Sequence, residues 1–121
     1  MNILYGITNC TTVKKARTWL ENNAIEYRFH DFRTHGLDTD TLQSFISSSG
    51  WETLLNRSGM TWRKLPEKDK SDLDERSALN LMLQFPTVIR RPVLMLDKTR
   101  TKKFYIGFQE AEYQKIFAVQ E

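Results

Sequence analysis

The fold is decided by residues 2–20, which read NILYGITNCTTVKKARTWL. The stretch Asn2–Ile7 is short, apolar and rich in β-forming residues, which is typical of a buried strand. The residues Thr8–Thr12 that follow are good helix caps. Apolar side chains then recur at helical spacing, at Val13, Ala16, Trp19 and Leu20. The pattern predicts a strand, a tight turn and a helix, with Cys10 in the first turn of the helix.

A second strand is predicted after this helix. The helical pattern stops near Asn22 and Asn23, and apolar and polar side chains then alternate over Ile25–Phe32. A strand, a helix and a strand within about 30 residues form a βαβ unit, whose crossover makes the two strands parallel. We therefore expect the chain to begin with two parallel strands joined by one helix.

The middle of the chain has helical patterns. Three helices are predicted, from Asp38 or Thr39 to Ser49-Gly50, over Trp51–Asn56, and from a cap at Ser71 or Asp72 to Phe85-Pro86. The stretch Gly59–Lys70 reads as a loop in which Trp62–Leu65 is anchored. Together these segments predict a helical insertion at about residues 40–85.

The last third returns to strands. It predicts a strand over Pro92–Leu96, a turn over Asp97–Arg100, a strand over Lys103–Ile106 and a helix over Glu110–Phe117. The order βαβ, helices, ββα is the plan of an α/β protein with a thioredoxin-like fold, a mixed sheet flanked by helices, here carrying a helical insertion. At 121 residues, the chain is expected to form a single domain over 1–121.

Composition limits the classes of function. Hydrophobic residues make up 40% and charged residues 27%, the balance of a soluble globular protein. No apolar run approaches the roughly 20 residues of a membrane span, and the N-terminus has no leader pattern, so we expect a cytoplasmic protein without a membrane partner. The basic residues form no long stripe, which argues against nucleic acid. The chain has one cysteine and two histidines, His30 and His35. We interpret both histidines as surface residues, and so few metal-binding side chains predict no metal site.

The net charge of +3 is unevenly placed. Residues 87–108 hold six Lys and Arg residues against Asp97 alone. This excess has two interpretations. It is either a solvated edge hairpin, whose lysines block aggregation, or a positive wall that attracts a small anion or an acidic partner.

The single cysteine is the candidate nucleophile. The backbone N–H groups of a helix's first turn are unpaired and the helix dipole favours negative charge there, so Cys10 is placed where a thiolate is stabilised. Lys14, four residues on, lies on the same helix face and can add a favourable charge. Thr11 can donate a hydrogen bond to the sulfur, and Asn9 can orient the turn, although capping alone explains Thr11 equally well.

A second candidate lies at Arg91-Pro92, where the third strand begins. Proline at the start of a strand can have a purely structural role, marking where the strand begins. In a thioredoxin fold a cis-proline sits here beside the active cysteine and leaves the preceding backbone free to pair with an extended thiol substrate. Arg91 would then place a fixed positive charge near the sulfur of Cys10.

Four motifs in order carry a family resemblance. They are YGITNCTTVKKAR over 5–17, LLNR over 54–57, TWRKL over 61–65 and RRPVL over 90–94. The chain resembles the ArsC/Spx superfamily over nearly its whole length, and its YffB-like branch most closely. The resemblance implies a thioredoxin-like core and, in the arsenate reductases, a single cysteine that attacks arsenic, glutathione that resolves the adduct and glutaredoxin that regenerates the enzyme. These enzymes hold the oxyanion with three arginines.

By motif, Cys10 matches the nucleophile and Arg91 the arginine before proline. At the second arginine position the chain has Asn56, with Arg57 one residue later. Phe108 follows Gly107 where an arginine would be expected. Gly6 stands where the arsenate enzymes have a histidine. Because oxyanion recognition depends on convergent arginines, these departures predict that arsenate itself is a poor substrate.

The sequence therefore predicts a glutathione-dependent thiol reductase that acts on a small thiol, disulfide or oxyanion substrate. Cys10 is the nucleophile, Arg91, Pro92, Thr11, Asn9, Lys14 and Arg57 are the binding candidates, and glutathione is a co-substrate rather than a bound cofactor. The alternative that the resemblance implies is an Spx-like redox or transcription regulator that binds RNA polymerase without catalysis. Such sensors typically carry Cys-x-x-Cys, and Val13 occupies the place of the second cysteine here.

Overall fold

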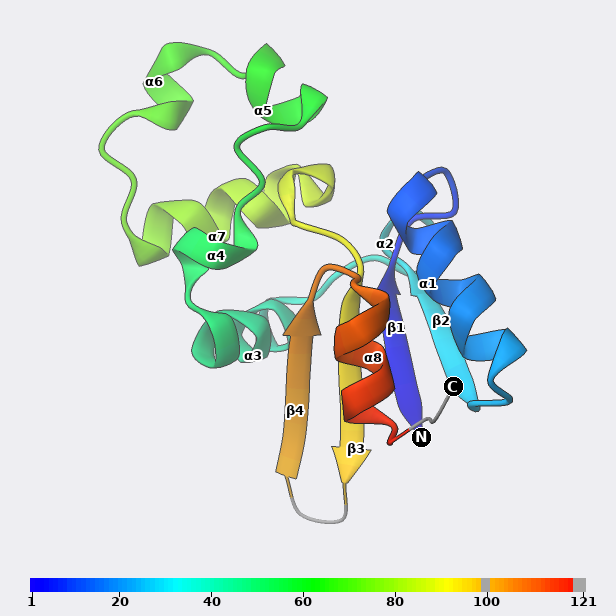
Figure 1. The fold of residues 1–121 in the computed structure, drawn as a ribbon. Coiled ribbons are helices and arrows are strands. Elements are labelled where there is room, and N and C mark those ends of the chain that lie inside the picture. The colour runs from blue at the N-terminus through cyan, green and yellow to red at the C-terminus, as the bar shows by residue number, and fades with distance from the viewer. Residues whose placement is uncertain (99–100, 119–121) are drawn as a thin grey trace. The chain divides into compact units, whose positions relative to one another are not determined.

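A computed structural model describes residues 1–98 and 101–118 of the chain. The chain divides into two compact units (Figure 1). The first, which we call the sheet unit, joins Met1–His35 to the chain from Arg91 onward, and the second, the helical unit, is Gly36–Arg90. The predicted helical insertion falls within the helical unit, and the prediction of a single domain stays a prediction.

The sheet unit contains a four-stranded mixed sheet in the order β2-β1-β3-β4. The strands are β1 (Asn2–Gly6), β2 (Tyr27–Asp31), β3 (Val93–Lys98) and β4 (Thr101–Ile106). The first two strands are parallel, while β3 runs antiparallel to both β1 and β4. In this register Leu4 lies opposite Phe29 on one side and opposite Leu94 on the other.

Two helices, α1 (Thr11–Asn22) and α8 (Glu110–Ile116), pack on one face of the sheet (Figure 1). The buried cluster between helices and strands is Leu4, Ala16, Trp19, Leu20, Leu94, Leu96 and Tyr113. The edge of the Trp19 ring meets the ring of Tyr113 at 5.6 Å between centroids. The helical spacing predicted for α1 is confirmed, since Val13, Ala16, Trp19 and Leu20 are its buried residues. This arrangement is the thioredoxin-like fold that the sequence predicted.

The helical unit contains five α-helices and a 3₁₀ turn among its described residues. They are α3 (Thr39–Ser49), α4 (Trp51–Leu54), α5 (Met60–Lys64), α6 (Glu67–Lys70), α7 (Glu75–Gln84) and η1 (Pro86–Val88). An isolated bridge pairs Leu55 with Ile89. The carbonyl of Leu54 accepts a hydrogen bond from the N–H of Arg90 at 2.8 Å, which fixes the end of this unit against α4.

Some predicted boundaries were wrong. The helix expected from Ser71 or Asp72 begins at Glu75 and is capped by Asp74. Asp72 has a left-handed backbone (φ 55°), which is incompatible with a helical residue. The stretch Gly59–Lys70, predicted as a loop, forms the short helices α5 and α6. The last two residues of the predicted turn, 99 and 100, lie outside the described residues.

The histidine prediction also needs correction. His30 is half-buried rather than a surface residue, because its ring packs 4.9 Å from that of Tyr5. His35 is exposed and ends the short helix α2 (Phe32–His35), which the sequence did not predict. The Nδ1 atom of His35 accepts a hydrogen bond from the backbone N–H of Asp31 at 3.2 Å, so this histidine closes a turn.

Candidate active site

Cys10 is the N-cap residue of α1, one position before the helix begins, and has an extended backbone (φ −146°, ψ 122°). Its carbonyl accepts a hydrogen bond from the N–H of Lys14 at 3.0 Å. Within the described chain, the Cys10 side chain makes no capping hydrogen bond, and it is half-buried. The thiol is therefore not used to hold the helix end. The first-turn N–H groups that lack intrahelical partners lie beside it, where the helix dipole stabilises negative charge.

The Arg91-Pro92 pair lies at the start of β3. The peptide bond between the two residues is cis, the form expected for a proline at this place in the fold. Pro92 is buried, and its carbonyl accepts a hydrogen bond from the N–H of Gly107 at 2.8 Å. Arg91 is half-buried.

Sheet register brings this pair and the cysteine to the same end of the sheet. Val93 of β3 lies opposite Tyr5 of β1, and the two strands are antiparallel. The chain before Val93 and the chain after Tyr5 therefore extend past the sheet side by side. Arg91-Pro92 stands on one side of this end, and the turn that leads to Cys10 stands on the other.

The neighbours of Cys10 are accessible. Asn9, Thr11 and Lys14 are all exposed, so their side chains are accessible to a ligand. Among the predicted site residues, these three and Arg91-Pro92 belong to the sheet unit, and the register places them toward the same end of the sheet as Cys10. Their roles as binding residues stay predictions.

Arg57 belongs to the helical unit. Its guanidinium lies 5.9 Å from the ring centroid of Trp51 and 5.7 Å from that of Trp62, two cation–π contacts within its own unit. Asn56, at the family's arginine position, accepts hydrogen bonds on Oδ1 from the backbone N–H of Ser58 at 3.2 Å and from its hydroxyl at 3.0 Å. Asn56 therefore has a local role in the turn.

A surface groove of about 410 Å³ begins next to the cysteine, since Thr11 contributes to its lining. Of the residues that line it, Thr11 and Lys14 were predicted site residues, whereas Lys15 and Glu110 were not. Phe108 also lines the groove. The sequence pointed to this position only through the family resemblance, because Phe108 stands where an arginine was expected. Its ring meets that of Tyr113 edge-on, with centroids 4.7 Å apart.

The interior beneath the groove is apolar. Tyr113 is fully buried, and within the described residues its hydroxyl has no hydrogen-bond partner. Burial raises the pKa of the Tyr113 phenol above its usual value, and the charge of Glu112 adds to the shift. The Tyr113 phenol therefore carries no charge at neutral pH.

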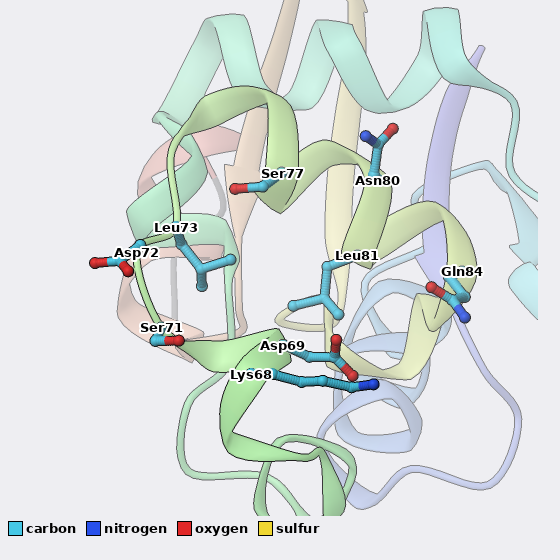
Figure 2. Close-up of a pocket in the computed structure, with 9 residues that line it drawn as sticks. All are labelled: Lys68, Asp69, Ser71, Asp72, Leu73, Ser77, Asn80, Leu81 and Gln84. Atoms are coloured by element: carbon cyan, nitrogen blue, oxygen red, sulfur yellow. The ribbon is translucent and has the colours of Figure 1, made fainter.

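A second hollow, of about 250 Å³, lies within the helical unit between α6 and α7. Figure 2 shows Leu81 projecting toward Lys68 and Asp69 there. It contains no thiol, and among residues 1–98 and 101–118 no three His, Cys, Asp or Glu side chains gather in a way that could hold a metal ion. No helix in the described chain has the length and apolar character needed to cross a membrane.

Comparison with known proteins relates this site to a family. A sequence model described as the ArsC family matches residues 5–116. The structure of a YffB protein is 44% identical in sequence, with a TM-score of 0.89, and the match covers 95% of this chain and 97% of that one. An arsenate reductase (ArsC) related protein from Brucella melitensis is 47% identical, with a TM-score of 0.74 and coverage of 98% and 95%.

A regulator is also among the relatives. The global transcriptional regulator Spx 1 of Lactococcus lactis is 30% identical over 111 residues, which are 90% of this chain and 83% of the regulator. The resemblance to the ArsC/Spx superfamily, and to its YffB-like branch, is confirmed. Because the family model spans nearly the whole chain, including Cys10 and Arg91-Pro92, this protein belongs to the ArsC family.

Proposed function

We propose that the protein is a glutathione-dependent thiol reductase with Cys10 as its nucleophile. The observation that carries the proposal is the position of the thiol. Cys10 is at the N-cap of α1, makes no capping hydrogen bond to the described chain, and stands at the same sheet end as Arg91-Pro92. A thiolate held at such a place is the species that attacks a disulfide sulfur.

The reaction runs through mixed disulfides. The Cys10 thiolate attacks one sulfur of a substrate disulfide, forms a Cys10–substrate disulfide and releases the other half as a thiolate, which takes a proton from water. A glutathione thiolate then attacks the substrate sulfur or the Cys10 sulfur. After two glutathiones have reacted, the substrate disulfide has become two thiols, glutathione has become its disulfide, and Cys10 is a thiolate again.

An external thiol is required because the chain has a single cysteine. Glutathione fits the charges at the site, since its carboxylates are complementary to Arg91 and Lys14. Its cysteinyl backbone can pair with the chain that precedes Pro92. Thr11 and Asn9 complete the turn around the sulfur, and glutaredoxin can regenerate the enzyme by taking the glutathionyl group from Cys10.

Arsenate is not the substrate that we propose. Phe108 and Asn56 stand where the arsenate enzymes have arginines. The Phe108 ring packs on Tyr113, and Asn56 is bonded to Ser58, so neither place provides a cation. An oxyanion would lose two of its charged contacts, each worth about 1.5–3 kcal/mol.

An enzyme that cycles with glutathione needs a reducing compartment, where thiols are kept reduced. We therefore propose that the protein works in the cytoplasm.

The test is to react the reduced protein with glutathione disulfide and to map the adduct by mass spectrometry. We expect one glutathionyl group, on Cys10, removed by further glutathione, and turnover of a small disulfide in an assay coupled to glutathione reductase. Cys10→Ser should lose both, while Thr12→Ala, a change at an exposed residue of the same turn, should keep both. A wild-type protein with no adduct and no turnover would refute the enzyme proposal.

The similarity to Spx 1 supports a second candidate, a regulator that binds RNA polymerase without catalysis. It would not use a dithiol switch, because Val13 stands at the second cysteine position and is fully buried. Recovery of RNA polymerase by the tagged protein, equally with Cys10→Ser and wild type, together with absent turnover, would favour this candidate.

A further inference from the structure

The groove that begins beside Cys10 has two chemically different walls. One is the outer face of α1, where Thr11, Lys14, Lys15 and Thr18 recur at helical spacing. The other is the connection from β4 to α8, which contributes Phe108 and Glu110. Its volume of about 410 Å³ is that of a small-molecule site.

The charges on the walls are of opposite sign and are not paired with each other. Lys14, Lys15 and Glu110 are exposed, and no ion pair involves any of them within the described part of the chain. A ligand with one carboxylate and one ammonium group would satisfy both walls. A simple anion would leave Glu110 without a partner, and a simple cation would leave the two lysines without one.

The floor between the charges is apolar. The Phe108 ring is held edge-on by Tyr113, and the nearly buried side chain of Trp19 also lines the groove. Such a floor accepts the methylene groups that separate the charged end of a ligand from its reacting sulfur. Phe108, at the position where an arginine was expected, therefore suits the methylene groups of a ligand rather than an oxyanion.

We propose that this groove binds the γ-glutamyl arm of glutathione while the sulfur of glutathione reacts at Cys10. The α-carboxylate lies against Lys14 and Lys15, the α-ammonium against Glu110, and the methylene groups on Phe108. The inference rests on the proposed function, because it assumes that glutathione reacts at this cysteine, and it adds where the tripeptide lies and which of its groups the protein recognises.

The lengths agree with this placement. From Thr11 to Lys15 the helix rises about 6 Å, at 1.5 Å per residue. A γ-linked glutamyl residue extends by roughly two residue lengths, about 7 Å, beyond the cysteinyl unit. Its charged end therefore reaches the level of the lysines when the sulfur is beside Cys10.

The experiment compares three disulfides as donors to Cys10, with the adduct followed by mass spectrometry. They are glutathione disulfide, the disulfide of cysteinylglycine, which lacks the γ-glutamyl arm, and N-acetylated glutathione disulfide, which lacks the ammonium charge. The variants are Lys15→Met, which leaves Lys14 and its charge near Cys10 in place, Glu110→Gln, and the control Lys64→Met at an exposed lysine of the helical unit.

We expect Lys15→Met to react about fivefold more slowly with glutathione disulfide and to be nearly unchanged with cysteinylglycine disulfide. Glu110→Gln should slow glutathione disulfide by about fivefold and leave its N-acetylated form unaffected. Lys64→Met should match the wild type with all three.

The failures of the two proposals are distinguishable. If Cys10 of the wild type reacts with glutathione disulfide and the groove variants change all donors equally or none, the groove assignment is wrong and the thiol reductase proposal stands. If the wild type reacts with none of the three, the proposed function itself is wrong.

Discussion

Gly6 and Val13 are packed so closely that a Cβ atom on Gly6 would lie 2.8 Å from Cγ2 of Val13. Gly6 is the last residue of β1, and Val13 is a fully buried residue in the first turns of α1. This contact sets how closely the strand end and the helix start approach each other, with Cys10 between them. A histidine at position 6, as in the arsenate enzymes, would need a different packing at Val13.

We predict that Gly6→Ala destabilises the protein by about 1–3 kcal/mol, the usual cost of overpacking a buried site. Val13→Ala removes the methyl groups that the new Cβ would meet, so the cost of Gly6→Ala should be smaller in that background. Urea unfolding of the wild type, both single variants and the double variant measures the coupling. Costs that simply add would mean that the Gly6–Val13 contact does not limit residue 6.

Arg91 should accelerate the reaction of Cys10 with anionic disulfides. We expect Arg91→Met to slow glutathionylation by about tenfold at low salt, with little change toward the uncharged hydroxyethyl disulfide. The difference should shrink as salt is added, because screening weakens the attraction. Arg28→Met, at an exposed arginine of β2, is the matched control. An equal loss of rate toward both disulfides would assign Arg91 to structure rather than to charge.

Asp74 gives α7 a pH-dependent cap. Its Oδ1 accepts hydrogen bonds from the backbone N–H and the hydroxyl of Ser77, both at 2.9 Å, and these bonds hold the pKa of Asp74 below its usual value of 3.8. A carboxyl group with a lowered pKa stabilises the fold above its unfolded pKa, and this contribution is lost as the pH falls through its folded pKa. We expect Asp74→Ala to lower the melting temperature at pH 7 and to have a smaller effect near pH 3.

Asp74→Asn keeps an oxygen acceptor at the cap without the charge. It should retain most of the stability at pH 7 and show less pH dependence than the wild type. Thermal unfolding of the three proteins from pH 3 to pH 7 checks both expectations. A constant gap between wild type and Asp74→Ala over this range would contradict the assigned role of the carboxylate.

Tyr113 buries a hydroxyl that has no hydrogen-bond partner in the described residues. Burying such a group costs about 1–3 kcal/mol, so Tyr113→Phe should be neutral or stabilising at pH 7. Burial raises the pKa of this phenol above 10, so the folded state holds its proton more tightly than the unfolded state. The wild type should therefore lose stability as the pH rises above about 10. Tyr113→Phe should lack this pH-dependent loss, because it has no phenol to ionise.

Urea unfolding at pH 7 and pH 11 measures the difference, with Tyr105→Phe as a control at a half-buried tyrosine. The advantage of Tyr113→Phe over the wild type should grow at the higher pH. A variant that is clearly less stable than the wild type at pH 7 would show that the hydroxyl contributes a favourable interaction.

The sequence alone predicted those features that depend on residues close together in the chain. The alternation of Ile25–Phe32 and the helical spacing from Val13 to Leu20 predicted β2 and α1, because each pattern describes one buried face of one element. Cys10 could be placed at the start of α1 for the same reason. The thioredoxin-like fold follows from the order of such elements.

The sequence was less informative where the signal was short. The helices α5 and α6 have five and four residues, too few for a periodic pattern to develop or for helix formation to be favourable without tertiary contacts. The start of α7 was predicted too early because Ser71, Asp72 and Asp74 are all good caps. The left-handed backbone of Asp72 and the reciprocal bonds between Asp74 and Ser77 decide among them.

By itself, the sequence determined the order of strands and helices, the single thiol and its place before α1, because these depend on residues a few positions apart. The predicted thioredoxin-like fold already implied that Arg91-Pro92 lies near Cys10, and the register of β1 with β3 places both at one sheet end. Only the tertiary structure decided that Lys14, Lys15, Phe108 and Glu110 line one groove. Those residues are up to 96 positions apart, and their meeting depends on the register of β1 with β3 and on the packing of α1 and α8 over one core. A local sequence pattern cannot predict that these residues lie close together, because it is the burial of the shared core that brings their segments together.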